Sequence, residues 1–349
     1  MQNQIKLTQF SKGSGCGCKI SSSQLDIILK DNEARIDFKN LLVGNNNRDD
    51  AAVFDLGDGT ALISTTDFFT PIVDDAFDFG RIASVNAIND IYAMGGKPVL
   101  AIAILGWNTE KLSPELAQQV IQGSRTICEE AGIPLAGGHS IETTEPVFGL
   151  AVNGIIPIKN LKKNNTAQNG DLIFLTKPLG IGILSAALKR GIVKEEDNKS
   201  SIYIMCQLNK VGMELGKLSG VTAMTDITGF GLLGHLIEMA DGSNLSAELN
   251  YASVPLIKGI ELYTQQFCFP DAVYRNWNSY EKKVKGIEGT SFITLCDPQT
   301  SGGLLIAVNP DSLSDFNKVM KEFGLDEITK TPIGKFIGKE DYSITLNLI

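Results

Sequence analysis

The chain has 349 residues, more than a single hydrophobic core usually holds, so two domains are predicted. Hydrophobic residues make up 43% and charged residues 20%, which excludes a disordered or fibrous chain. The net charge of −9 argues against nucleic-acid and anionic-membrane partners, because their phosphates would be repelled. The first ten residues lack a basic region followed by an apolar one, and no apolar run is long enough to span a membrane. We therefore expect a cytoplasmic protein.

The first half of the chain reads as a hairpin followed by alternating helices and strands. The periodicity of apolar residues and the turn signals predict a helix at 21–30, strands at 51–54 and 60–66, a helix at 78–94, a strand at 98–106, a helix at 113–131, and strands at 133–136 and 147–156. Asn86 and Asp90 are four residues apart and share a helix face. The run Gly137–Ser140 is expected to form a turn of small residues, of the kind whose amides bind anions.

The second half repeats this alternation after a polar connection at 157–170. We expect a strand at 172–176, helices at 181–190 and 203–218, a strand at 221–226, a helix at 232–240, strands at 245–249 and 304–308, a helix at 311–323, and strands near 332 and 344. Residues 268–289 are expected to be a long surface excursion. The predicted class is α+β, with a flexible segment and anchoring helix at 1–40 and domains at 41–160 and 161–349.

The segment Gly13–Lys19 reads Gly Ser Gly Cys Gly Cys Lys and precedes any core element. Its glycines predict a mobile loop that can approach a ligand closely. Cys16 and Cys18 are compatible with a metal pair, a redox pair, or a nucleophile beside a bystander. Lys19 would favour the thiolate or meet a phosphate. The remaining cysteines are scattered and are interpreted as buried thiols: Cys128, Cys206, Cys268 and Cys296.

Four aspartates lie at predicted strand ends or on a helix face of small residues: Asp50, Asp67, Asp90 and Asp226. Any one of them could be a turn cap or a solvated residue. Unpaired carboxylates in apolar surroundings are costly, so together they indicate a cation, and oxygen ligands of this kind suit Mg²⁺ completed by substrate phosphates.

No P-loop and no dinucleotide-binding glycine motif is present where either fold would need it. The candidate phosphate contacts are therefore Lys19, Arg48 and the amides of 138–140. The histidine in this glycine run, His139, is open to either a structural or a functional role. His235 lies among apolar residues of a predicted helix and is interpreted as structural.

Seven motifs occur in order and span nearly the whole chain: Gly Ser Gly Cys Gly Cys Lys at 13–19, Asn Arg Asp Asp Ala Ala Val at 47–53, Ser Thr Thr Asp Phe Phe at 64–69, the segment 86–96, Gly Gly His Ser at 137–140, Met Thr Asp Ile Thr Gly Phe Gly at 224–231, and Cys Asp Pro Gln Thr Ser Gly Gly at 296–303. Together they resemble the motifs of the selenophosphate synthetase (selenide, water dikinase) family. One departure is Asn89, where the family pattern has serine.

The resemblance implies an aminoimidazole ribonucleotide synthetase-like fold and a homodimer whose N-terminal sheets join across the interface. It also implies synthesis of selenophosphate from selenide, ATP and water, with release of AMP and orthophosphate, as the selenium supply for selenocysteine and selenouridine. The implied cofactor is Mg²⁺, with K⁺ as a further candidate. The implied partners are ATP, selenide and, as a candidate, a selenium-delivery protein, without nucleic acid or membrane.

The resemblance also assigns roles to individual residues. Cys16 takes the catalytic cysteine position and Lys19 that of an essential lysine. The metal positions correspond to Asp50, Asp90 and Asp226. The ATP-binding positions correspond to Lys19, Asn47, Arg48, Asp49, Asp67, Asp90, Gly138, His139 and Ser140. The loop is expected to be disordered without nucleotide and to close over bound ATP.

Two alternatives remain at this stage. Another ATP-using enzyme of the same superfamily would not need a thiol in the 13–19 loop. A non-enzymatic selenium or metal carrier would use Cys16 and Cys18 to bind its cargo stoichiometrically, but would have no need of four separated aspartates.

Overall fold

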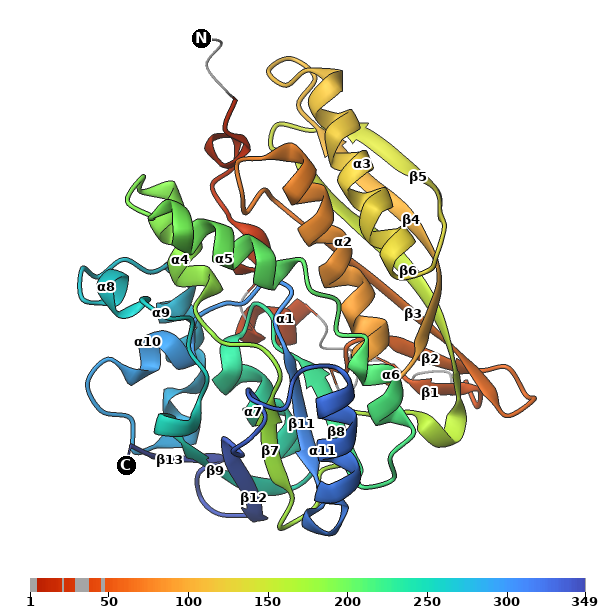
Figure 1. Ribbon diagram of the computed structural model, residues 1–349, viewed down its shortest axis with the longest axis vertical. Coiled ribbons are helices and arrows are strands. Elements are labelled where there is room, and N and C mark those ends of the chain that lie inside the picture. Colours follow the sequence, from red (N-terminus) through yellow and green to blue (C-terminus); the bar gives the residue numbers. More distant parts are fainter. Residues whose placement is uncertain (1–4, 21, 29–37, 45–47, 349) are drawn as a thin grey trace.

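The computed structural model describes residues 5–20, 22–28, 38–44 and 48–348. Within them the chain forms two β-sheets with associated helices, which confirms the predicted two-domain α+β class. Figure 1 shows the first sheet with α2 and α3 on one side of the molecule, and the second sheet below them. None of the helices in these ranges combines the length and the apolar character needed to cross a membrane.

The first sheet has six strands in the order β1-β2-β3-β6-β4-β5. The strands are β1 Leu41–Val43, β2 Ala52–Asp55, β3 Thr60–Phe69, β4 Lys97–Trp107, β5 Leu135–Glu142 and β6 Val147–Pro157. The expected hairpin is present, since β2 pairs antiparallel with β3. Long antiparallel pairing of β3 with β6 makes these strands the centre of the sheet, and β5 pairs parallel with β4 at the edge.

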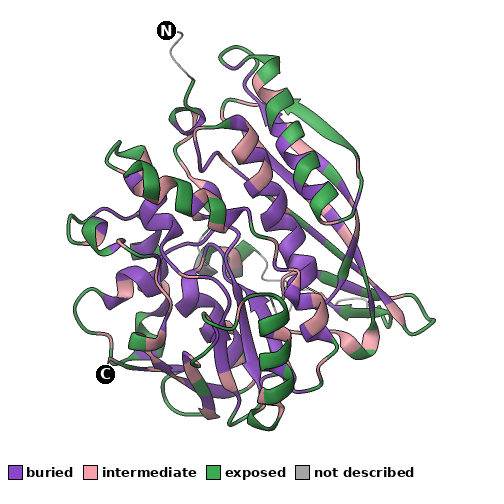
Figure 2. Ribbon diagram, viewed as in Figure 1, coloured by how far each residue is buried: buried purple, intermediate pink, exposed green. Residues whose placement is uncertain are grey.

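Two helices, α2 (Ala76–Ala93) and α3 (Pro114–Glu130), cover one face of this sheet. They approach each other closely because Gly80 and Gly123 lack side chains: a Cβ on Gly80 would lie 1.9 Å from the carbonyl oxygen of Val120. Helix α2 also contacts the second domain through α5, α6 and β8. Nearly every α2 residue is therefore buried, as Figure 2 shows in purple.

The second sheet has seven strands in the order β10-β13-β9-β12-β7-β11-β8. The strands are β7 Leu172–Leu175, β8 Val221–Asp226, β9 Leu245–Asn250, β10 Val284–Lys285, β11 Leu304–Val308, β12 Gly334–Gly338 and β13 Ile344–Asn347. The central strand β11 is buried along its whole length and reads as a continuous apolar run. Its pairing with β8 sets Leu304 opposite Asp226, which fixes that carboxylate at a strand end facing the first domain.

The remaining helices frame this second sheet. They are α1 Ser22–Ile28, α4 Ile181–Lys189, α5 Glu195–Met205, α6 Val211–Gly216, α7 Gly231–Gly242, α8 Glu261–Thr264, α9 Ala272–Tyr280, α10 Ser291–Leu295 and α11 Leu313–Glu322. Figure 1 shows α5 beside α2 and α4 next to α5, with α8, α9 and α10 on the left of the view. The loop that carries the first two cysteines lies close to both domains, because its amides donate to Thr70 of the first and Thr300 of the second.

Three local predictions are wrong. The helix expected at 203–218 is two helices, α5 and α6, because Asn209 between them donates its backbone N–H to Asn89 and its side-chain amide to the Gly302 carbonyl. The excursion expected at 268–289 contains α9, which is held by hydrogen bonds from the Asn276 side chain to the carbonyls of Gly229 and Cys296. These bonds join residues far apart in the sequence, so no local pattern predicts them.

The turn expected at 137–140 is also wrong, because β5 runs through it. The strand accommodates its two glycines as an irregularity in the pairing with β4. Gly138 has a φ of 154°, and a Cβ there would lie 2.2 Å from the carbonyl oxygen of Ala103. The glycine is therefore needed for close backbone approach within the sheet.

Candidate active site

The loop Gly13–Lys19 is held between the two domains. It contains a short 3₁₀ helix, and Gly15 adopts a φ of 50° at its start. The Gly15 amide donates to the Thr70 carbonyl of the first domain at 3.1 Å. The Cys16 amide donates to the Thr300 hydroxyl of the second domain at 3.0 Å. The backbone of Gly229 passes so close that a Cβ there would lie 2.5 Å from the Cys16 carbonyl oxygen.

Asn86 of α2 connects the Cys16 thiol to the rest of the cluster. Its Oδ1 accepts the Cys16 Sγ–H at 3.3 Å and the Ser301 amide at 2.7 Å. Its Nδ2 donates to Asp67 Oδ2 at 2.5 Å. The thiol is 1% exposed, and this burial raises its pKa despite the opposing charge of Lys19. Lys19 acts on the thiol in the expected direction, since its charge lowers the Cys16 pKa, but desolvation outweighs this effect.

Lys19 supplies the positive charge of the cluster. Its Nζ donates to the Thr228 hydroxyl at 3.4 Å. Burial disfavours the charged amine, but the carboxylates of Asp67, Asp90 and Asp226 outweigh burial and raise its pKa. Lys19 is therefore charged at neutral pH, and one ammonium group faces several carboxylates.

The four predicted aspartates converge from separate elements. Asp50 precedes β2, Asp67 lies in β3, Asp90 lies on α2 and Asp226 ends β8. Asp50 Oδ1 accepts the Thr225 hydroxyl at 2.7 Å, and Asp90 Oδ2 accepts the Thr65 hydroxyl at 2.5 Å.

Burial, and then repulsion between carboxylates, raises the pKa of three of these aspartates, Asp50, Asp90 and Asp226. Burial raises the pKa of Asp50, with the Asp226 charge adding to the rise, and it raises the pKa of Asp90, with the Asp67 charge adding. Burial also raises the pKa of Asp226, to about 7, and Lys19 opposes this rise. Such mutual repulsion shows that the aspartates are neighbours, and it is relieved when a cation binds among them.

The donor set fits a magnesium ion. Asp50 Oδ2 and Asp226 Oδ2 are buried and have no hydrogen-bond partner. Two orphaned carboxylate oxygens suit Mg²⁺, which binds one or two carboxylates and takes waters and phosphate oxygens for the remainder. In the described part of the chain no group of three or more His, Cys, Asp or Glu side chains is arranged to hold a metal by itself. The described carboxylates would share such an ion with waters and phosphate oxygens.

Arg48 and Asp49 contact the second domain. Asp49 Oδ1 accepts the Asn164 amide at 2.7 Å, and burial raises the pKa of Asp49 to about 6. Arg48 has a φ of 53°, its carbonyl accepts the Asn164 side-chain amide at 3.0 Å, and its Nη1 lies 3.4 Å from Glu238 Oε1. Asn47, the remaining predicted residue of this motif, lies outside the described residues.

The residues predicted at 138–140 are not brought to the aspartate cluster within one chain. They lie on the edge strand β5, are exposed, and pair with β4, with His139 opposite Ile104. His235 is buried on α7, as interpreted, and its Nε2 accepts the Thr228 amide at 3.1 Å.

Sequence reasoning missed several residues that build the site: Asn86, Thr228, Thr300 and Ser301. The shared helix face of Asn86 and Asp90 was visible in the sequence and was the available signal for the first of them. The others lie within two of the resembling motifs but have small hydroxyl side chains, which carry no chemical signature of their own.

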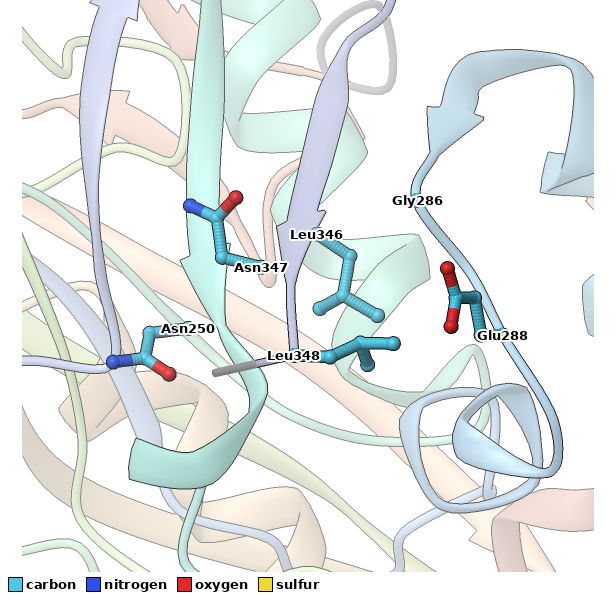
Figure 3. Close-up of a pocket in the computed structure, with 6 residues that line it drawn as sticks. All are labelled: Asn250, Gly286, Glu288, Leu346, Asn347 and Leu348. Atoms are coloured by element: carbon cyan, nitrogen blue, oxygen red, sulfur yellow. The ribbon is translucent and has the colours of Figure 1, made fainter.

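A separate hollow of about 560 Å³ lies near the C-terminal strand (Figure 3). Its described lining consists of Asn250, Gly286, Glu288, Leu346, Asn347 and Leu348. Figure 3 shows Glu288 across the hollow from Leu346 and Leu348. None of the predicted site residues lines it.

Comparison with known proteins agrees with the two-domain fold. The N-terminal domain model of AIR synthase related proteins matches residues 48–156, and the C-terminal domain model matches residues 168–347. Thiamine monophosphate kinase from Aquifex aeolicus has a TM-score of 0.66 at 17% identity, covering 93% of this chain and 96% of its own. The hydrogenase maturation protein HypE in complex with ATP has a TM-score of 0.64 at 16% identity, covering 95% and 87%.

These matches define the class, a two-domain protein with the AIR synthase-like fold. Closer relatives define the family. A selenide, water dikinase of Aeromonas hydrophila is 54% identical over 95% of this chain and 96% of its own length. One of Pseudomonas putida is 52% identical over 99% of both chains. The chain belongs to the selenide, water dikinase family.

Proposed function

We propose that the protein synthesises selenophosphate from selenide, ATP and water, and releases AMP and orthophosphate. One observation carries this function: relatives more than half identical over nearly the full length are selenide, water dikinases. The buried thiol of Cys16 beside an aspartate cluster supports it, because neither a simple kinase nor a carrier needs both groups in one place.

The residues divide into three roles in this proposal. Asp50, Asp90 and Asp226 would hold Mg²⁺, which when bound offsets the negative charge of the triphosphate and aligns it for transfer. Lys19 would stabilise charge that develops on the transferred phosphoryl group. Its raised pKa supports this role, because the ammonium stays charged. K⁺ is proposed as a further cation.

Cys16 is proposed to position selenide at the phosphoryl group. Its thiol proton has an acceptor in Asn86 Oδ1, and Asn86 in turn donates to Asp67. A substitution at Asn86 or Asp67 would therefore alter the hydrogen bonding of the Cys16 sulfur. Closure of the loop over ATP would exclude water from the first transfer. The contacts to Thr70 and Thr300 support such a closed position, since each domain supplies one of them.

The proposed nucleotide contacts are Lys19, Asn47, Arg48, Asp49, Asp67, Asp90, Gly138, His139 and Ser140. In a homodimer with joined N-terminal sheets, the 138–140 segment of one chain could serve the site of its partner. The position of β5 at a sheet edge with exposed residues supports pairing with another strand.

We also propose that the two domains begin at residues 41 and 161. A selenium-delivery protein is proposed as a partner, and the proposed location is the cytoplasm.

Anaerobic incubation with ATP, Mg²⁺, K⁺ and selenide tests the function, with ³¹P NMR to identify the products. Selenophosphate and AMP are expected, and both should depend on selenide. Cys16→Ser should abolish selenophosphate, whereas Cys128→Ser, which alters another buried cysteine, in α3, should not. Asp50→Ala should weaken metal-dependent nucleotide binding. Production of ADP without AMP would contradict the proposal, and stoichiometric selenium binding without turnover would favour the carrier alternative.

A further inference from the structure

A hollow of about 460 Å³ lies beside the Cys16 loop, on the face that carries Cys18. Its walls are the loop itself, α4 and α9. Cys18 is exposed and lines this hollow, whereas Cys16 is buried and does not. Both cysteines belong to the four-residue 3₁₀ helix Gly15–Cys18. Cys16 contacts Asn86 of the site and Cys18 lines the hollow, so one short loop adjoins both.

The lining of this hollow is basic. It includes Lys12, Lys189, Arg190 and Arg275 but only one carboxylate, Asp271. The four cations and one anion give a local charge of 4 − 1 = +3, in a chain whose net charge is −9. Glu145, which accepts the Lys12 amide at 3.3 Å, lies close by and reduces this excess to about +2 without removing it.

Three of the four cations, Lys189, Arg190 and Arg275, are held by neutral groups. Lys189 Nζ donates to the carbonyls of Ser11 and Lys12 at 3.2 Å each, and to that of Gly13. Arg275 Nη2 donates to the Gly17 carbonyl at 2.8 Å, and Arg190 Nη1 to that of Phe267 at 3.0 Å.

Carbonyl contacts fix these side chains in place but do not cancel their charge. Across the described ranges no carboxylate lies within ion-pair distance of the four cations. Burial lowers the pKa of Lys189, and the negative charge of Glu145 opposes that effect. Cys18 and Lys189 line the same hollow.

We propose that this hollow is the entry site for the chalcogenide substrate, a small soft anion of the hydrogen selenide type. The inference rests on the proposed function. An anion that approached the aspartate cluster directly would be repelled, whereas a basic hollow next to it raises the local anion concentration. The Cys18 sulfur offers a polarisable contact in that hollow. The loop then separates capture on the Cys18 face from reaction on the Cys16 face.

The first test is steady-state kinetics of Lys12→Gln/Arg190→Gln. Among the described residues neither side chain hydrogen-bonds to the backbone of the 13–19 loop, and Arg190 bonds to the Phe267 carbonyl instead. At low ionic strength we expect the KM for selenide to rise about threefold or more with a small change in kcat, and the difference to shrink as salt screens the charges. The KM for ATP should not change. Lys318→Gln/Lys321→Gln on the exposed side of α11 is the matched control.

The second test measures the hollow without turnover, by the alkylation rate of Cys18 identified by mass spectrometry. Anionic iodoacetate should react faster relative to neutral iodoacetamide in the native protein than in Lys12→Gln/Arg190→Gln. The proposal would be overturned if the ratio of the iodoacetate rate to the iodoacetamide rate were equal in the native protein and the variant, and the KM for selenide were unchanged. An altered ratio in a protein that makes no selenophosphate would instead contradict the proposed function and leave the anion site standing.

Discussion

Asn86 is the residue on which the most contacts of the site depend. One carboxamide accepts the Cys16 thiol and the Ser301 amide and donates to Asp67. It thereby joins the loop, the 296–303 segment and the aspartate cluster. Its oxygen and nitrogen have different partners, so an isosteric carboxylate cannot replace it: Asp at this position would face Asp67.

Asn86→Ala should leave a buried thiol, a backbone N–H and a carboxylate without partners. We expect the free energy of unfolding in urea to fall by about 1–3 kcal/mol. We also expect faster alkylation of Cys16 by iodoacetamide, because the loop loses its contact with α2. Asn89→Ser, on the same helix, introduces the residue of the family pattern and should leave Cys16 as slow to react as in the native protein. Slow alkylation in Asn86→Ala would contradict the positioning role.

Gly229 is the second residue on which the loop position depends. A Cβ there would lie 2.5 Å from the Cys16 carbonyl oxygen and 3.0 Å from Lys19 Cδ. Gly229→Ala should displace the loop and reduce selenophosphate formation at least about tenfold, because displacement of reacting groups by about 1 Å costs roughly that much or more. Gly338→Ala on β12 meets no atom within 4 Å and is the matched control. Equal rates of the two variants would show that the loop tolerates the displacement.

At the scale of the elements, α7 carries a buried histidine. Burial lowers the pKa of His235 to about 3, with the charge of Lys19 adding to the effect, while an unfolded chain titrates it near 6.5. The folded protein therefore binds fewer protons than the unfolded chain between these pH values. This contribution to stability is fully present above about pH 6.5 and is lost as pH falls.

His235→Gln keeps an acceptor near the Thr228 amide and removes the titration. As pH falls from 6.5 to 5, the native protein should lose about 2 kcal/mol of unfolding free energy relative to the variant, at about 1.4 kcal/mol per pH unit. Urea unfolding at several pH values measures the difference, and titrations common to both proteins cancel. A difference that is constant with pH would show that His235 can take up a proton in the folded state.

The elements also show where sequence patterns succeed. Helix α2 was predicted within two residues at its start because its apolar period is strong, and the β2–β3 hairpin because Asp-Gly marks its turn. The break between α5 and α6 and the position of α9 depend on single polar side chains, Asn209 and Asn276, that reach distant carbonyls. The glycines of β5 look like a turn in sequence, although contact with β4 makes them part of a strand.

At the scale of the whole molecule, the site lies where the two domains meet. The Cys16 amide and the Thr300 hydroxyl are 284 positions apart, and Asp50 and Thr225 are 175 positions apart. Residue chemistry could indicate which aspartates were candidate metal ligands. The family resemblance supplied their assignment to one site. Local patterns could not show that Asn86 joins the parts, nor that 138–140 lies away from them, because both follow from the packing of α2 and β5.

In the described part of the chain, one face of the first sheet has no helix packed over it. Helices α2 and α3 cover the other face. Strand register sets Phe54 opposite Leu62, Leu62 opposite Ile155, Phe68 opposite Gly149 and Ile102 opposite Ala151. The apolar side chains in this register share the open face, and Phe68, Ile102 and Ile155 are 54%, 42% and 44% exposed. Neighbouring exposed apolar side chains of this size indicate a protein interface.

The proposed homodimer predicts that this face is covered in solution. Ile102→Lys/Ile155→Lys places two charges on it and should give a monomer by sedimentation at micromolar concentration, with an unchanged far-ultraviolet circular dichroism spectrum. Tyr203→Lys, on α5, replaces an even more exposed large side chain elsewhere and should remain dimeric. If joined sheets also bring 138–140 to the partner's site, the monomeric variant should lose nucleotide affinity while Tyr203→Lys keeps it. A native protein that sediments as a monomer would contradict the dimer, and a monomeric variant with full affinity would place the whole nucleotide site in one chain.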